Sequence, residues 1–243
     1  MCIRDRLGLG NSITGGAAVS EVLPSDISNL GIWLQNDTGV ATGQWDDSSG
    51  NGRHAVQGTG TQQASVSGGG LDFSSADPED FYQFTTDTSA LIEIKHPNAF
   101  TLAVVLKREG GADDDNVLIS SSASNNFIGI LSENNITVHG SGATFTGEPW
   151  ANNEQLLLTM TKDTSGNLLF FKNGVAESIT SGSTTATATS EFLLDYLGAT
   201  RNGLAANDKH FDGIIYELVV YTSALTGGDL TNLNSYLTGK FGL

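Results

Sequence analysis

The sequence predicts an all-β protein, a sandwich of two antiparallel sheets with one short helix near its carboxyl end. Many short segments alternate apolar and polar side chains, as strands with one buried face do. The chain has 30 glycines against four prolines, which is typical of many tight turns between short elements. A helical repeat of apolar residues occurs only between residues 227 and 242. Together these patterns favour a two-sheet antiparallel sandwich.

We expect a single domain over residues 30–243, since 243 residues suit one large β-sandwich. Residues 1–6, MCIRDR, lack the apolar stretch of a signal peptide. They resemble translated sequencing-adapter read-through, so Met1 is not expected to be the true start. Residues 7–24 are rich in Gly, Ser and Ala and predict a linker. Pro24-Ser25-Asp26 then predicts one short helical turn.

The first strand is expected at residues 30–35, with Leu30, Ile32 and Leu34 on one face and Trp33 on the other. Asn173-Gly174 predicts a tight hairpin turn. The remaining strands are expected at residues 71–73, 82–84, 99–107, 116–121, 126–131, 135–139, 154–162, 168–172, 192–198 and 211–222.

The helix is expected within residues 227–242 and is expected to cover one end of the sandwich. Asp229 near its amino end and Lys240 near its carboxyl end both suit the helix dipole. One apolar stripe follows the helical repeat, formed by Leu230, Leu233, Tyr236 and Leu237.

The charge of the chain argues against several partners. There are 27 Asp and Glu against 11 Lys and Arg, a formal net charge of −16. Such a chain repels nucleic-acid phosphates and anionic membranes. No apolar run approaches the ~18 residues of a membrane span, so we expect no membrane insertion. Cys2 is the one cysteine, so neither an internal disulfide nor a cysteine metal site is expected.

Residues 45–54, WDDSSGNGRH, combine residue types found in catalytic and metal sites, but their order favours a turn. Gly50 and Gly52 can adopt positive φ, and Asn51 tolerates it. Asp47 can accept hydrogen bonds from backbone N–H groups that follow it. Trp45 offers a large apolar surface that can hold the loop in place.

No catalytic residue is predicted. Glycoside cleavage needs two carboxylates placed across a sugar ring, whereas Glu93 and Glu217 each stand alone on a predicted strand. The four histidines are scattered, so no zinc site is expected.

Calcium is the one metal that the sequence suggests. Asp113, Asp115 and Asn116 lie in a predicted loop where adjacent carboxylates repel unless a cation relieves them. The alternative is a solvated acidic turn, which is the more common fate of a charge run.

Sugar recognition usually uses an exposed aromatic ring with polar side chains around it. Trp150, with Asn152 and Asn153 beside it in a polar loop, is the predicted glycan contact. The alternative is that Trp150 anchors the loop against the sandwich.

Four stretches resemble laminin G-like domains of the concanavalin A-like lectin/glucanase superfamily, in the order that the family shows. They are GIWLQNDTGVATGQWDDSSGNGRHAVQ (31–57), GGLDFSSADPEDFYQF (69–84), LLLTMTKDTSGNLLFFKNGV (156–175) and residues 197–237. The resemblance implies a concanavalin A-like jelly-roll sandwich. Glucanases of this superfamily carry Glu-x-Asp-x-(x)-Glu on one strand, and this chain has no such run.

We therefore expect a non-catalytic module that binds a glycan or cell-surface polysaccharide. It is expected outside the cell or on a virion, as part of a larger secreted protein or a phage structural or adhesion protein, of marine phage or bacterial origin. One alternative is a purely structural decoration that contacts other virion or surface proteins. A second is a polysaccharide-cleaving enzyme whose carboxylates meet only in space.

Overall fold

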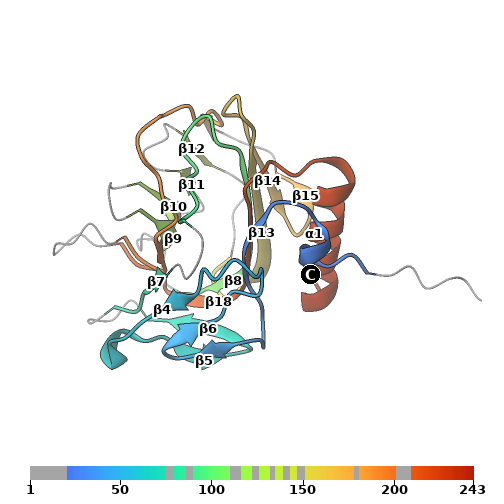
Figure 1. Cartoon of the computed structure of the whole chain (residues 1–243). Helices are drawn as coiled ribbons and strands as arrows, with labels where there is room; N and C mark the ends of the chain where they lie inside the picture. The colour runs from blue at the N-terminus through green and yellow to red at the C-terminus, as the bar shows by residue number, and fades with distance from the viewer. Residues whose placement is uncertain are drawn as a thin grey trace, which may run out of the picture.

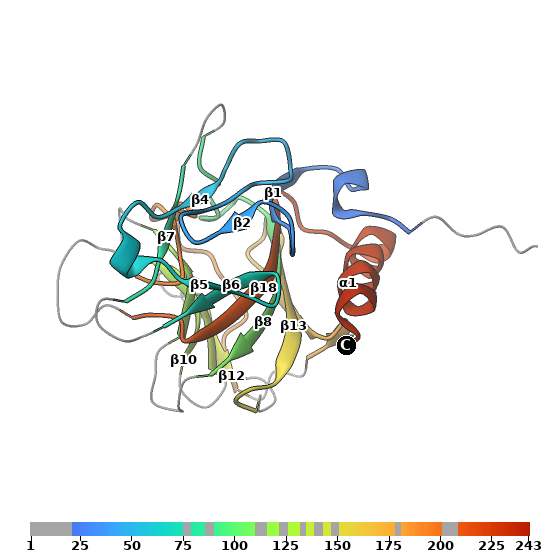
Figure 2. The ribbon, with the colours of Figure 1, turned by 90° about the horizontal axis from the view of Figure 1, so that it is seen from below.

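The computed structural model describes residues 21–74, 79–85, 90–109, 116–121, 126–131, 135–138, 143–146, 151–177, 181–200 and 209–243. Two antiparallel sheets face one another, and one helix lies outside them (Figures 1 and 2). This confirms the predicted two-sheet sandwich with a C-terminal helix. Among the described helices, none is both long and apolar enough to cross a membrane.

The first sheet, here called the β8 sheet, has the order β15-β14-β13-β8-β18-β6-β5, and β1 also pairs with β18. All of its pairings are antiparallel. Its strands are β1 (Leu30–Leu34), β5 (Ser65–Ser67), β6 (Gly70–Phe73), β8 (Phe100–Arg108), β13 (Gln155–Lys162), β14 (Leu168–Lys172), β15 (Val175–Ala176) and β18 (Gly213–Tyr221).

The second sheet, here called the β10 sheet, has the order β16-β12-β11-β10-β9-β17-β7-β4-β3-β2. Several of its members are two-residue strands that carry no readable alternation. Its strands are β2 (Val40–Ala41), β3 (Gln44–Trp45), β4 (Ala55–Val56), β7 (Tyr82–Phe84), β9 (Asn116–Ser120), β10 (Phe127–Leu131), β11 (Asn135–Val138), β12 (Ala143–Thr146), β16 (Ser181–Gly182) and β17 (Tyr196–Leu197).

The main core lies between the two sheets. Alternate residues of β8, such as Leu102 and Val104, join it, and so do Leu158 and Met160 of β13. The residues that alternate with them, Ala103 and Val105, belong to a second cluster on the other face of the same sheet. The β8 sheet is therefore buried on both faces here, which explains why β8 reads as a nearly continuous apolar run.

Helix α1 (Gly227–Phe241) covers the outer face of the β8 sheet rather than an end of the sandwich (Figure 2). Its predicted placement was therefore wrong. The helix lies there because the outer face of the β8 sheet carries the second apolar cluster, and an apolar sheet face must be buried against another element. The stripe supplies Leu233, Tyr236 and Leu237, which pack with Trp33, Val105, Leu157, Val219 and Tyr221.

Two local expectations were also wrong. The strand expected at 192–198 is reduced to Tyr196–Leu197, since only an isolated bridge pairs Leu193 with Glu93. Leu30 lies with Trp33 in the outer cluster, because the register of β1 shifts between Leu30 and Ile32.

The predicted helical turn at Pro24–Asp26 is confirmed as the 3-10 helix η1. A second 3-10 helix, η2, spans Gly60–Gln62.

Candidate functional site

Two of the three predicted glycan contacts, Asn152 and Asn153, lie on a turn that leads into β13. Trp150 lies outside the described residues. Asn152 and Asn153 are exposed, and Asn153 has a left-handed φ of 64° while its backbone N–H donates to the Arg108 carbonyl at 2.8 Å. Within the described part of the chain, neither asparagine amide has a hydrogen-bond partner. Both amides are accessible, and their role in sugar binding stays a prediction.

The predicted calcium ligands are only partly described. Asp113 and Asp115 lie outside the described residues. Asn116 is fully buried at the start of β9, and its side-chain oxygen accepts a hydrogen bond from the Asp212 backbone at 2.9 Å. Asn116 therefore offers no exposed ligand to that loop. The described residues contain no group of three or more His, Cys, Asp or Glu side chains that could hold a metal, and calcium stays a prediction.

The WDDSSGNGRH loop braces β1 through the carboxylate of Asp47. One oxygen of Asp47 accepts from the backbone N–H groups of Trp33 and Ser49, both at 2.9 Å. The other accepts from the Ser49 hydroxyl at 2.8 Å and from the Arg53 backbone at 3.0 Å. Asp47 is 8% exposed and Trp45 is fully buried. These bonds confirm that the loop is a structural turn.

The two glycines of the loop behave as predicted. Gly50 and Gly52 have φ values of 82° and 67°, in the left-handed region that glycine adopts without a steric penalty. Asn51 does not use this region; instead its side-chain amide donates to the Leu30 carbonyl at 2.9 Å. The loop is therefore tied to β1 by a second route.

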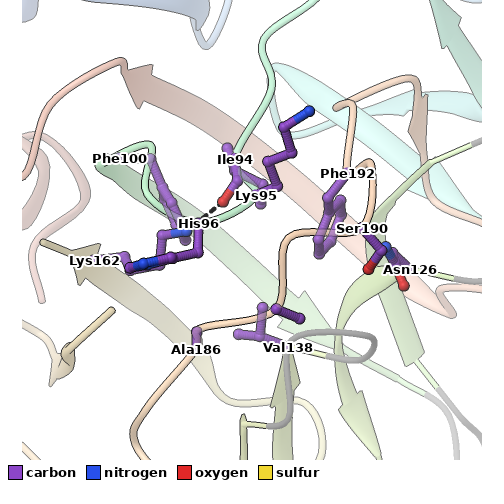
Figure 3. Close-up of a pocket in the computed structure, with 11 residues that line it drawn as sticks. Ile94, Lys95, His96, Phe100, Asn126, Val138, Lys162, Ala186, Ser190 and Phe192 are labelled. Atoms are coloured by element: carbon purple, nitrogen blue, oxygen red, sulfur yellow. Dashed lines mark hydrogen bonds between the residues drawn. The ribbon is translucent and has the colours of Figure 1, made fainter. Parts of the chain in front are cut away.

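A small cavity lies where β13 ends, between the two sheets (Figure 3). Lys162, the last residue of β13, is 2% exposed and donates a hydrogen bond to the Ile94 carbonyl. Its amine lies 5.6 Å from the centre of the Phe100 ring. Burial lowers the pKa of Lys162 to about 8. The Nδ1 atom of the neighbouring His96 is buried and has no hydrogen-bond partner among the described residues.

This cavity is too small to be a sugar site. Its volume is about 10 Å³, which is room for about one water molecule. An amine whose pKa lies near 8 can act as a base or a nucleophile, but here no substrate can reach it. The Lys162 cavity is therefore a small packing gap with polar groups in its wall, at the end of the core.

Glu217 is a fully buried carboxylate between β18 and α1. It accepts hydrogen bonds from the Trp33 indole N–H at 2.8 Å and from the Lys240 amine at 2.6 Å. The Asn36 backbone and the Tyr236 hydroxyl lie at 3.3 and 3.5 Å. With its oxygens occupied in this way, Glu217 fastens the helix to the sheet and does not face a substrate.

A larger hollow, here called the α1 groove, lies between α1 and the β14–β15 hairpin, which stand beside each other in Figure 1. Its volume is about 280 Å³ and it opens to solvent, close to the ~300 Å³ lower limit of small-molecule sites. All of its lining residues are uncharged, and they include Phe171, Asn173, Val175, Leu230, Asn234 and Ser235.

The sequence did not predict the α1 groove, because its two walls lie far apart in the chain and meet only when the helix packs on the sheet. One signal was present: Asn234 follows Leu233 within the helix and is 6% exposed in the structure. A polar residue at a buried helix position usually has a partner or a role.

The two antiparallel sheets with their outer helix define a lectin-like β-sandwich fold. The model of the concanavalin A-like lectin/glucanases superfamily, laminin G type, matches residues 79–231. The chain belongs to this family. A search of curated proteins finds no matching sequence.

Solved structures share the fold at low sequence identity. A Trypanosoma rangeli sialidase in complex with 2,3-difluoro-KDN is 12% identical, with a TM-score of 0.58 over 88% of this chain. The binding domain of botulinum neurotoxin DC, in complex with rat synaptotagmin II, is 14% identical, with a TM-score of 0.57 over 86%. A structure of botulinum neurotoxin type C, whose cell entry depends on two ganglioside molecules, is 15% identical with a TM-score of 0.55 over 86%.

The chain spans only part of these proteins: 33% of the sialidase chain, 52% of the neurotoxin DC chain and 51% of the type C chain. At such identities the likeness concerns the fold alone.

Proposed function

We propose that this chain is a non-catalytic module that binds carbohydrate, placed outside the cell or on a virion as part of a larger surface or adhesion protein. The observation that carries the proposal is the α1 groove. Its amide and hydroxyl groups lie beside an aromatic ring, Phe171, and no charge lines it. Such a lining is complementary to a sugar ring, because the ring combines hydroxyl groups with an apolar face. The lectin-like family and the glycan-binding structural neighbours support the proposal.

A glycan array probed with the whole chain tests this function. We expect retention of a defined subset of glycans, measured once with calcium and once with a chelator. A calcium requirement would point to the loop that carries Asp113 and Asp115. If no glycan is retained in either condition, the carbohydrate function is wrong and a purely structural contact with other surface proteins takes its place.

A polysaccharide-cleaving enzyme is the second candidate, and Asp72 is the observation that favours it. Burial raises the pKa of the Asp72 carboxyl, and the nearby carboxylates of Glu109, Asp212 and Asp80 raise it further, while Lys107 opposes them. A carboxyl group that keeps its proton can serve as a general acid. Release of reducing ends from polysaccharides, lost in Asp72→Asn, would establish this function; its absence from the unmodified chain would dismiss it.

A further inference from the structure

The α1 groove contains two asparagine side chains that are held in the same way. The Asn173 side-chain oxygen accepts a hydrogen bond from the Leu157 backbone at 2.8 Å. The Asn234 side-chain oxygen accepts one from the Thr159 hydroxyl at 2.7 Å. Leu157 donates from its backbone and Thr159 from its side chain, and the two residues lie two positions apart on β13. Strand β13 therefore fixes both amides by their oxygens.

Fixing the oxygens leaves the two NH₂ groups as donors. A carboxamide carries two donor hydrogens on its nitrogen, and within the described residues neither nitrogen has a hydrogen-bond partner. Both side chains line the α1 groove. Asn234 is only 6% exposed, but its amide nitrogen is not among the described buried polar atoms that lack a partner, so solvent or a ligand in the groove can accept a hydrogen bond from it. The groove thus presents two oriented donors to whatever occupies it.

The rest of the groove is apolar or weakly polar. Phe171 is half-buried, and Val175 is 70% exposed at the edge of the sheet. The Thr231 hydroxyl already donates to the Gly227 carbonyl, so it can only accept from a ligand. With no cation among the lining residues and a net charge of −16 on the chain, a carboxylate ligand would meet repulsion without compensation.

From this arrangement, which rests on the proposed carbohydrate function, we infer that the α1 groove binds an uncharged sugar residue. The apolar face of the sugar ring lies against Phe171, and its oxygens accept hydrogen bonds from the amides of Asn173 and Asn234. The ligand class therefore differs from the difluoro-KDN and the gangliosides named for the structural neighbours.

Matched glycans and variants test this inference. The array carries galactose-, glucose-, mannose- and N-acetylglucosamine-terminated glycans, together with sialylated counterparts of the galactose-terminated ones. Asn173→Asp keeps the oxygen that accepts from Leu157 but removes the donor. Asn234→Leu removes the other donor and fills its buried position with an apolar side chain. Asn232→Ala, on the same helix as Asn234, is the matched control because Asn232 does not line the α1 groove. Asn152→Ala probes the separate contact that the sequence predicts in the turn before β13.

We expect the unmodified chain to prefer uncharged termini. Each groove variant should weaken binding about five-fold or more, as the loss of one hydrogen bond does, while Asn232→Ala leaves binding unchanged. Circular dichroism and melting temperatures confirm that each variant is folded. Binding that survives both groove variants but is lost in Asn152→Ala overturns the inference and leaves the carbohydrate function standing. A preference for sialylated termini also overturns it, whereas an unmodified chain that binds no glycan overturns the proposed function itself.

Discussion

Replacement of Lys162 by methionine is expected to stabilise the protein near neutral pH and to lose this advantage in alkali. The pKa of Lys162 is lowered from 10.5 in the unfolded chain to about 8 in the folded one. Below about pH 8 the amine is charged in both states, so folding bears the full penalty of burying the charge. Above the unfolded value the amine is neutral in both states and the penalty disappears.

The size of the effect follows from the shift. Each pKa unit corresponds to about 1.4 kcal/mol, so a change from 10.5 to about 8 gives an upper limit of ~3 kcal/mol. Methionine has a similar length and no charge, but it leaves the Ile94 carbonyl without the Lys162 donor, which costs about 1 kcal/mol. We therefore expect a net gain of roughly 1–2 kcal/mol at about pH 7.

Urea unfolding of the two proteins at about pH 7, 8.5 and 10 measures this difference. Lys172→Met is the control, because Lys172 is a partly exposed lysine paired with Glu154 at 2.9 Å and its loss changes the net charge of the chain equally. The advantage of Lys162→Met over the unmodified protein should fall by about 2 kcal/mol across this pH range, so that it is lost at about pH 10. Free energies of unfolding that stay parallel over the whole range would refute the reasoning.

Three further substitutions test the packing. Gly70→Ala would place a Cβ 2.1 Å from the Ile215 carbonyl oxygen and should lower the free energy of unfolding by ~3 kcal/mol. Its control, Gly58→Ala, has open space around it and should change the free energy of unfolding by less than about 0.5 kcal/mol. Equal effects of the two substitutions would contradict the described register. Asp47→Ala should cost about 2–4 kcal/mol in urea unfolding, because it leaves buried N–H groups without an acceptor, and a neutral result would mean that the loop does not brace β1. Glu217→Gln should lower the melting temperature by about 4–8 °C, equivalent to ~2 kcal/mol in a chain of this size, and an unchanged melting temperature would show that its ion pair does not hold α1.

The fold was predictable wherever the deciding pattern was local. The strand expected at 99–107 is found at Phe100–Arg108, and the one expected at 168–172 at Leu168–Lys172, because side chains on a strand alternate whatever lies opposite them. The turn at Asn173-Gly174 was also local, and both residues have positive φ values, 49° and 78°. Strands of two residues could not be predicted, because they are defined only by their partners.

The candidate site was far less predictable, because its chemistry depends on contacts between distant segments. Glu217 stood alone in the sequence, yet one of its hydrogen-bond donors is the Trp33 indole, 184 positions away. The α1 groove arises only when the helix lies on the outer face of the β8 sheet, and the sequence favoured a position at the end of the sandwich instead. The sequence signal that could have indicated these contacts was a polar residue within a predicted helix or strand, such as Asn234 or Lys162. Both are buried in the structure, and a buried polar group needs a partner.

The position of α1 has a practical consequence for anyone who shortens or tags this chain. A version cut before Gly227 would leave the aromatic and aliphatic side chains of Trp33, Val105 and Tyr221 facing water, and two such copies would tend to press these faces together and precipitate. Leu243 is held against the end of α1, since its backbone N–H donates to the Thr238 carbonyl at 3.0 Å. A purification tag fused after Leu243 needs a flexible spacer, so that it does not displace α1 from the outer face of the β8 sheet.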